Sequence, residues 1–311
     1  MVDCPDTLVY GTSWFMYDEV GKIREARPCG WGHAGESERL ENTTSDQASA
    51  GVRSFAEFVV RSAPGVSHKG GDMSLPLQDR VAIVVGSSSG MGRATAVAYA
   101  AAGAKIVAAA RTSEKLDELV AEIGSSAVSC PTDVQDVSQV ENLIRTTLDQ
   151  FGRVDIVVYA TGTNIPNRSL KELTHETWEL MIGTNLTGAF NCTSAVLPAM
   201  REQKSGLIIY LSSGCVQSPD MSGVSYQATK QGLSGLAHGT FQEVREDGIR
   251  TTVIFPGLCD TPLVLKRPTP TPPEVMAKAL KPEDVAAACL FVASLPSRTR
   301  VPELVLLPSG L

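Results

Sequence analysis

The chain has 311 residues, of which 43% are hydrophobic and 20% charged, and its formal net charge at neutral pH is −7. These values are ordinary for a globular protein, and the length allows one large α/β domain plus an extension. The acidic balance and the lack of a basic cluster exclude nucleic acid as the expected partner. No apolar run reaches the roughly eighteen residues of a membrane span, and the first residues lack a signal-peptide pattern. We therefore expect a cytoplasmic protein without a membrane partner.

Seven cysteines occur at irregular spacings, with no Cys-x-x-Cys pair and no cluster of histidines. An odd number without such a pattern is typical of reduced thiols, rather than of a disulfide framework or a zinc site. We therefore expect no metal.

Residues 1–72 differ in composition from the rest of the chain. Two strand-like runs, Leu8–Tyr17 and Lys22–Arg27, flank Asp18–Gly21 and predict a hairpin. The residues that follow, as far as Gly71, show little apolar periodicity. A segment of this kind has no core of its own, so we predict a poorly structured N-terminal extension made of a hairpin and a disordered linker. The hairpin is similar to the closing strands of an NTF2-like (SnoaL-type) domain.

Residues 73–311 alternate apolar strand-like runs with helical periods, as one domain. The helical periods show apolar residues at i, i+3, i+4 and i+7, as in 116–123, which Gly124 closes. Strands this apolar, separated by helices, predict a doubly wound (Rossmann) α/β fold, with a parallel seven-stranded sheet covered by helices on both faces. The predicted strands are Val81–Val85, Lys105–Ala110, Ala127–Cys130, Val154–Tyr159, Leu207–Leu211, Arg250–Phe255 and Glu303–Leu307.

A glycine-rich turn follows the first of these strands and precedes a helix of small residues. Glycine permits a tight turn, close approach of the backbone to phosphate, and close helix packing. The helix N-terminus then offers N–H groups and a partial positive charge to a pyrophosphate. A purely structural loop is the alternative, but the position between strand and helix favours a dinucleotide site. Its predicted cofactor-binding residues are Gly86, Ser88, Ser89, Gly90, Met91 and Gly92.

The end of the second strand bears on which dinucleotide is bound. An enzyme that uses NAD has an acidic residue there to hold the ribose hydroxyls. This chain has Ala110-Arg111 instead, with a guanidinium that can bind a 2′-phosphate and no carboxylate to repel it. We therefore expect NADP(H) as the cofactor, the alternative being that Arg111 only caps a surface strand. Arg93 is a second candidate for the phosphate.

Tyr226 and Lys230 stand one helical turn apart on one face of a predicted helix. A free phenol has a pKa of about 10, too high for easy proton exchange at neutral pH. A lysine ammonium nearby favours the phenolate, so we predict that Lys230 lowers the pKa of Tyr226. Alone, such a pair is usually a surface pair. After the glycine turn it predicts a general acid/base.

These motifs resemble the short-chain dehydrogenase/reductase family, and the resemblance covers roughly residues 77 to 311. It implies that Asn185 is an active-site asparagine in a water-linked proton path, and that Ser213, with Ser212 as the alternative, donates to the substrate oxygen. It further implies that Lys230 holds the nicotinamide ribose, and that the protein forms a homodimer or homotetramer. The other cofactor contacts that it implies are Asp133, Val134, Gly162, Pro256, Gly257 and Thr261.

The sequence departs from the family after the fourth strand, where Tyr159-Ala160-Thr161-Gly162 replaces Asn-Asn-Ala-Gly. We expect altered local packing there, without loss of chemistry. The C-terminal segment 301–308 resembles members related to the NADP-dependent hydroxy-acid dehydrogenases. The proline-rich segment 261–273 predicts a short, stiff substrate lid. Its Lys266 and Arg267 could bind a carboxylate or be exposed loop charges.

The sequence thus predicts an NADPH-dependent oxidoreductase that interconverts a ketone or aldehyde and an alcohol on a small to medium substrate, with Tyr226 as general acid/base. Two alternatives stay open. One is an epimerase or dehydratase of the extended branch, which shares Tyr-x3-Lys but usually has a different glycine spacing. The other is a catalytically idle NADP-binding sensor or scaffold, which would not need the whole set of Asn185, Ser213, Tyr226 and Lys230.

Overall fold

The computed structural model describes residues 9–10, 13–17, 23–28 and 75–311, which belong to two compact units. In the first unit, strands β1 (Val9–Tyr10), β2 (Ser13–Tyr17) and β3 (Ile23–Pro28) form a small antiparallel sheet. The predicted hairpin is therefore present as β2 and β3, with β1 as an additional strand. The predicted linker lies outside the described residues.

The second unit is built on a seven-stranded sheet in which every pair of neighbouring strands is parallel. Its strand order is β10-β9-β8-β7-β4-β5-β6, so the order reverses between β4 and β7. The predicted doubly wound sheet is confirmed. The strands are β4 (Val81–Val85), β5 (Lys105–Ala110), β6 (Ala127–Pro131), β7 (Ile156–Tyr159), β8 (Gly206–Leu211), β9 (Ile249–Pro256) and β10 (Glu303–Leu306).

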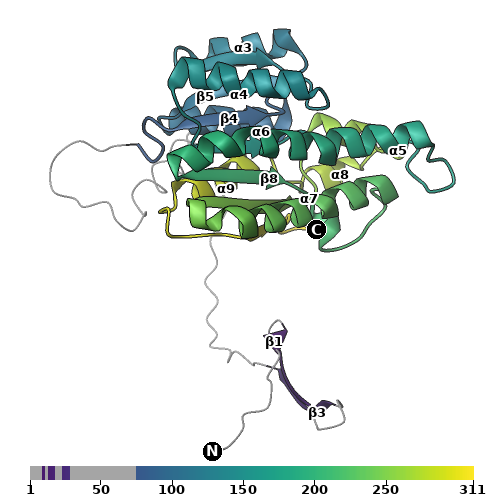
Figure 1. Cartoon of the computed structure of the whole chain (residues 1–311). Coiled ribbons are helices and arrows are strands. Elements are labelled where there is room, and N and C mark those ends of the chain that lie inside the picture. Colours follow the sequence, from purple (N-terminus) through teal and green to yellow (C-terminus); the bar gives the residue numbers. More distant parts are fainter. Residues whose placement is uncertain (1–8, 11–12, 18–22, 29–74) are drawn as a thin grey trace, which may run out of the picture. The chain divides into compact units, whose positions relative to one another are not determined.

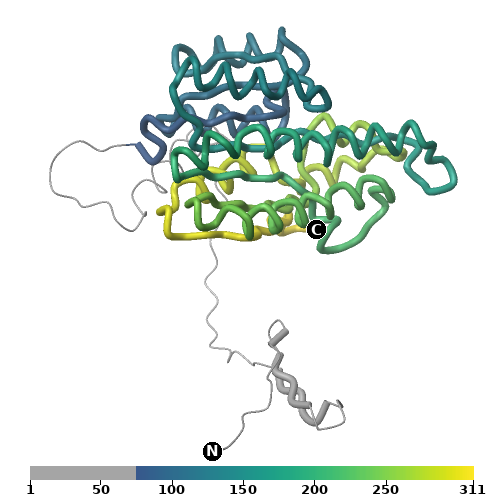
Figure 2. The backbone as a smooth tube through the Cα atoms, viewed as in Figure 1, coloured from purple at the N-terminus to yellow at the C-terminus, as the bar shows by residue number. Residues whose placement is uncertain are grey.

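Helices cover both faces of this sheet, and Figure 2 follows the backbone as it passes between the layers. Alternate residues of each buried strand enter different cores, as Ile83 and Val84 do in β4. Such strands are apolar throughout because neither face meets water. One face carries α2 (Gly90–Ala101), α3 (Ser113–Ile123) and α9 (Pro282–Ser294), and the other α4 (Val137–Phe151), α6 (Gly188–Gln203) and α7 (Val224–Val244) (Figure 1).

The helices end where the sequence indicates. The carboxylate of Asp136 caps α4 by accepting hydrogen bonds from the N–H groups of Ser138 and Gln139. Gly152 ends the same helix with a φ of +72°, a left-handed conformation that favours glycine. Gly124 ends α3 with a φ of +86°.

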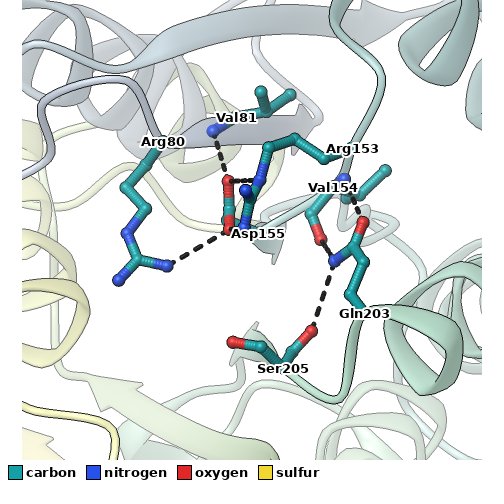
Figure 3. Close-up of polar contacts among 7 residues, drawn as sticks. All are labelled: Arg80, Val81, Arg153, Val154, Asp155, Gln203 and Ser205. Carbon is teal, nitrogen blue, oxygen red and sulfur yellow. Dashed lines mark hydrogen bonds and ion pairs between the residues drawn. The ribbon is translucent and has the colours of Figure 1, made fainter.

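A buried carboxylate fastens the amino-terminal edge of the sheet (Figure 3). Asp155, just before β7, accepts a hydrogen bond of 2.9 Å from the N–H of Val81 in β4. It also pairs with Arg80 at 3.2 Å and with Arg153 at 2.6 Å. Beside it, Gln203 from the end of α6 bonds both backbone groups of Val154. These contacts align β4 and β7, the two strands on either side of the point where the strand order reverses.

Three shorter features complete the second unit: α5 (His175–Ile182), the π-helical turn Gly183–Thr187 that joins it to α6, and α8 (Pro273–Met276). Single-turn 3-10 segments lie at Gly214–Val216, Arg245–Asp247 and Pro262–Lys266. Among the described helices, none is long and apolar enough to cross a membrane.

Candidate active site

A cleft opens at the carboxyl ends of the central strands, where the strand order reverses. In doubly wound sheets ligands bind at this place. The structure brings the predicted cofactor residues of four strand ends together there: the glycine turn after β4, Arg111 after β5, Asp133 and Val134 after β6, and Gly162 after β7. Tyr226, Lys230 and Thr261 also line this cleft.

The glycine turn has no room for side chains. Gly86 has a φ of +93°, and a Cβ placed there would lie 2.7 Å from the backbone nitrogen of Thr161. A Cβ on Gly92 would lie 2.8 Å from the carbonyl carbon of Gly86. Both distances are shorter than van der Waals contact, so the two glycines allow the turn, the helix start and the loop after β7 to pack closely.

The turn leads directly into the N-terminus of α2, which has no side-chain cap. The N–H groups of the first helical turn have no partner within a helix, and they carry the positive end of the helix dipole. They lie along the same cleft as Ser88 and Ser89. The bare backbone, the close-packed glycines and the free N–H groups fit the pyrophosphate of a dinucleotide.

The cleft beyond β5 is lined by Ala110, Arg111 and Thr112. Arg111 is exposed and has no ion-pair partner among the described residues. Arg93, the second candidate for a phosphate contact, forms an ion pair with Glu122 of α3. The guanidinium that the structure leaves available in this part of the cleft is therefore that of Arg111.

A second cavity, of about 340 Å³, adjoins the cofactor cleft. Ser213, Pro256 and Gly257 line this cavity rather than the cleft, while Thr261 and Tyr226 line both. The predicted lid supplies one wall, since Leu263 and Val264 of the 3-10 turn and Arg267 lie along it. Tyr226 thus stands where a cofactor site and a substrate-sized space meet.

The structure separates the two candidate serines. Ser212 is buried, and its hydroxyl donates a 2.8 Å hydrogen bond to the carbonyl oxygen of Lys230. Ser213 precedes the 3-10 turn at Gly214, and its Oγ accepts a 3.3 Å bond from the N–H of Cys215. Ser213 lines the cavity, and its hydroxyl lies close enough to Tyr226 to lower the pKa of the phenol through a side-chain hydrogen bond.

The prediction that Lys230 lowers the pKa of Tyr226 is wrong for this structure. Burial raises the pKa of the Tyr226 phenol above its usual value, and the groups that oppose this rise are Ser213 and Arg168. The Lys230 ammonium lies 5.8 Å from the centre of the Tyr226 ring and donates a 2.8 Å bond to the carbonyl of Leu211. Burial also lowers the pKa of Lys230 itself, to about 8.

Asn185 lies in the π-helical turn and is fully buried. Its Oδ1 accepts a 2.7 Å bond from the N–H of Thr163, while its Nδ2 donates to the carbonyl of Thr163 and to the hydroxyl of Thr229. The amide therefore braces the loop after β7 against α7, the helix that carries Tyr226 and Lys230. Its part in a proton path stays a prediction.

The expected change of packing at Tyr159 has a definite form. This side chain is fully buried, and its hydroxyl donates a 2.5 Å bond to the carbonyl oxygen of Thr184, next to Asn185. Gly188 leaves the space that the phenol fills, because a Cβ there would lie 2.6 Å from the Tyr159 hydroxyl. Tyr159 thus fixes the π-helical turn from the sheet side.

Sequence reasoning missed Arg168, which lies in the loop between β7 and α5. It is 8% exposed and lines the cavity beside Tyr226. The available signal was an arginine in the stretch that joins a cofactor-contacting strand end to the next helix. In the described residues no three His, Cys, Asp or Glu side chains form a group that could hold a metal ion.

Comparison with known proteins agrees with this geometry. Residues 80–270 match the model of the short chain dehydrogenase family. An uncharacterized oxidoreductase of Staphylococcus haemolyticus is 33% identical over 233 residues, which are 75% of this chain and 98% of that protein.

Two solved structures are similar across most of their length. A 3-ketoacyl-(acyl-carrier-protein) reductase from Brucella melitensis, complexed with NADH, has a TM-score of 0.70 at 24% identity, covering 75% of this chain and 98% of its own. At that identity the likeness concerns the fold. A serine dehydrogenase in its closed form, complexed with NADP+, has a TM-score of 0.68 at 28% identity, covering 73% and 94%.

Proposed function

The chain belongs to the short-chain dehydrogenase family and is an oxidoreductase of that type. We propose that it is an NADPH-dependent carbonyl reductase, which acts reversibly on a small to medium ketone or aldehyde. The observation that carries this proposal is the position of Tyr226. Its phenol lines both the dinucleotide cleft and the adjoining cavity, and Ser213 lies on the cavity side.

The reaction needs a hydride on the carbonyl carbon and a proton on the carbonyl oxygen. A nicotinamide held in the cleft would supply the hydride. Tyr226 Oη gives its proton to the oxygen, and the raised pKa of this phenol keeps that proton in place at neutral pH. Ser213 Oγ donates a hydrogen bond to the same oxygen, where negative charge develops. The Cys215 N–H bond to Ser213 Oγ holds this hydroxyl in position.

Lys230 and Asn185 keep Tyr226 in place. The Lys230 ammonium is fixed by the carbonyl of Leu211, on the cleft wall, where it can bind the ribose hydroxyls. A Cβ at position 162 would lie 3.1 Å from its Nζ, so Gly162 leaves this ammonium its space. Asn185 braces α7 through its hydrogen bond to Thr229.

The preference for NADPH rests on Arg111. Its guanidinium is exposed on the cleft, and the neighbouring Ala110 and Thr112 offer no carboxylate to a ribose. A guanidinium binds a phosphate through charge-assisted hydrogen bonds, whereas a carboxylate at this place would repel it. The similar serine dehydrogenase is complexed with NADP+ and the similar reductase with NADH. Arg111 at the end of β5 in this protein favours NADP+, the cofactor of the serine dehydrogenase complex.

The test is turnover of a ketone panel with NADPH by wild-type protein and by Tyr226→Phe. The phenylalanine keeps the shape of the ring and removes the proton donor, so kcat should fall at least about a hundredfold while the dissociation constant of NADPH stays nearly unchanged. Saturable NADPH binding without turnover of any carbonyl compound by the wild type would favour an idle sensor. Appreciable activity in Tyr226→Phe would remove the proton assignment.

A further inference from the structure

Two arginines outside the proposed catalytic set line the cavity beside Tyr226. Arg168 comes from the loop between β7 and α5, and Arg267 follows the 3-10 turn of the lid. They are 99 positions apart in the sequence but their charges interact, because each side chain faces the same small space.

Arg168 is held rigidly. Its Nε donates a 2.9 Å hydrogen bond to the carbonyl of Ile165, and its Nη2 donates a 2.6 Å bond to the carbonyl of Lys266 in the lid. The aliphatic part of the Arg168 side chain packs against Gly223, the residue just before α7. A Cβ on Gly223 would lie 2.7 Å from the Cβ of Arg168. The third nitrogen, Nη1, has no hydrogen-bond partner in the part of the sequence that the structure describes.

Neither guanidinium is in direct ion-pair contact with a carboxylate of the described residues. In residues 75–311 no ion pair joins Arg168 or Arg267 to a carboxylate, that of the terminal Leu311 included. Arg267 donates only to the hydroxyl of Thr271. Burial and the neighbouring Arg267 lower the pKa of Arg168 below its usual value, and the charges of Tyr226 and Asp220 oppose this only in part. Burying an unpaired cation beside a second one is costly, which indicates that something outside the protein compensates it.

We propose that Arg168 and Arg267 form an anion subsite that binds a carboxylate of the substrate while Tyr226 acts on its carbonyl group. The proposal rests on the proposed carbonyl reductase function and narrows its substrate class to keto acids and the matching hydroxy acids. The planar guanidinium of Arg168, fixed at two nitrogens, leaves Nη1 to bind a carboxylate oxygen from one direction.

The remaining charge of the cavity favours a carboxylate over a phosphate. Asp220 is the acidic side chain that lines it, alongside the two arginines. Its Oδ1 accepts a hydrogen bond from the N–H of Ser222, so it stays near the start of α7. Asp220 would repel a phosphate with nearly two negative charges more strongly than a carboxylate.

The test compares α-, β- and γ-keto acids of five carbons with their methyl esters, using NADPH and the full-length protein. For at least one of the three positions of the keto group, wild type should reduce the acid with a kcat/KM roughly tenfold or more above that of its ester. Arg267→Gln should lower kcat/KM for that acid by roughly ten- to a hundredfold, and change that for its ester by less than about threefold. Arg168→Gln should lower kcat/KM for the acid by clearly more than that for the ester, whose reduction it also affects through the pKa of Tyr226. Arg267→Gln keeps the test valid if loss of the Arg168 backbone contacts prevents folding.

Lys171→Gln is the matched control. It removes one positive charge from the same loop as Arg168, yet Lys171 is exposed and lines neither cavity. It should therefore leave the preference for the acid intact. An equal loss in this variant would assign the effect to the general field of the loop and overturn the subsite.

A binding measurement separates this proposal from the proposed function. Pentanoate, a five-carbon monocarboxylate that cannot be reduced, should bind wild type in calorimetry and fail to bind both arginine variants, and inorganic phosphate should bind more weakly than pentanoate. If neither acids nor esters are reduced, the carbonyl reductase function fails, and pentanoate still decides the subsite. Esters reduced as well as acids, or pentanoate binding unchanged in the variants, would overturn the subsite and leave the reductase function standing.

Discussion

Lys230 is predicted to lower the stability of the folded protein at neutral pH. It is 4% exposed, and burial lowers its pKa from 10.5 to about 8. Between these two values the unfolded protein binds more protons than the folded one, so the free energy of unfolding rises with pH in this window. Below pH 8 the folded protein must bury the ammonium. The substitution Lys230→Met removes this charge and keeps an unbranched side chain.

The size of the effect follows from the shift. A difference of about 2.5 pH units corresponds to about 3 kcal/mol between the two protonation states. Integration over the titration predicts that the free energy of unfolding of wild type increases by about 2 kcal/mol, relative to Lys230→Met, from pH 7 to pH 9.5. The variant also leaves the carbonyl of Leu211 without its donor, a penalty of about 1–3 kcal/mol. That penalty does not depend on pH, so it leaves the slope unchanged.

Urea unfolding followed by circular dichroism at pH 7, 8, 9 and 9.5 measures both proteins. Other titrating groups, such as the buried tyrosines and cysteines, are common to the two and cancel in the difference. Lys278→Met, which removes an exposed ammonium, is the control for loss of charge alone. A difference between wild type and Lys230→Met that stays constant over this range would refute the reasoning. It would show that the ammonium is as well solvated in the folded protein as in the unfolded one.

Three further expectations concern the cofactor, the sheet and the extension. Arg111→Ala should weaken NADPH binding by roughly 1–3 kcal/mol and leave NADH nearly unchanged; equal effects on both cofactors in fluorescence titration would contradict the assignment. Tyr159→Phe should lower the free energy of unfolding by about 1–3 kcal/mol, because the carbonyl of Thr184 loses its buried donor, and a urea midpoint equal to that of wild type would contradict it. A shortened protein of residues 73–311 should keep the melting temperature and turnover of the full-length protein, since its similar Staphylococcus relative is matched over 98% of its length by 75% of this chain. A loss of either would make 1–72 part of the working enzyme.

The sheet could be predicted because its strands are buried on both faces. In a parallel sheet covered by helices, strand ends coincide with the ends of apolar runs, and the predicted strands differ from the observed ones by at most two residues at either end. β7 shows the largest difference, since it begins at Ile156 rather than at Val154. The reason is local: both backbone groups of Val154 bond to the side chain of Gln203 instead of to a neighbouring strand. The backbone of Asp155 still bonds to Val81 and Leu207, although the regular strand begins only at the next residue.

The site was predictable only in part, because spacing along the sequence gives the placement of motifs and not their electrostatic surroundings. The four-residue spacing put Tyr226 and Lys230 on one helical face, but it could not show that the ammonium bonds to Leu211 and that burial governs the phenol. Likewise, Arg168 belongs to no motif, and its neighbour Arg267 is brought to it only by the fold.

Arg168 connects the proposed anion subsite with the proton donor, because its charge lowers the pKa of Tyr226 in this structure. An anion bound at the proposed subsite would cancel much of that charge, because the same guanidinium would face both groups. The phenol would then hold its proton more firmly when a keto acid occupies the cavity, which suits an acid that must keep its proton until hydride arrives. In the reverse direction the same effect would disfavour the phenolate that must accept a proton from the alcohol. The pH dependence of alcohol oxidation should therefore lie at higher pH for a hydroxy acid than for its methyl ester, and this difference should vanish in Arg168→Gln. An identical dependence for the two substrates in wild type would show that the subsite and the proton donor act independently.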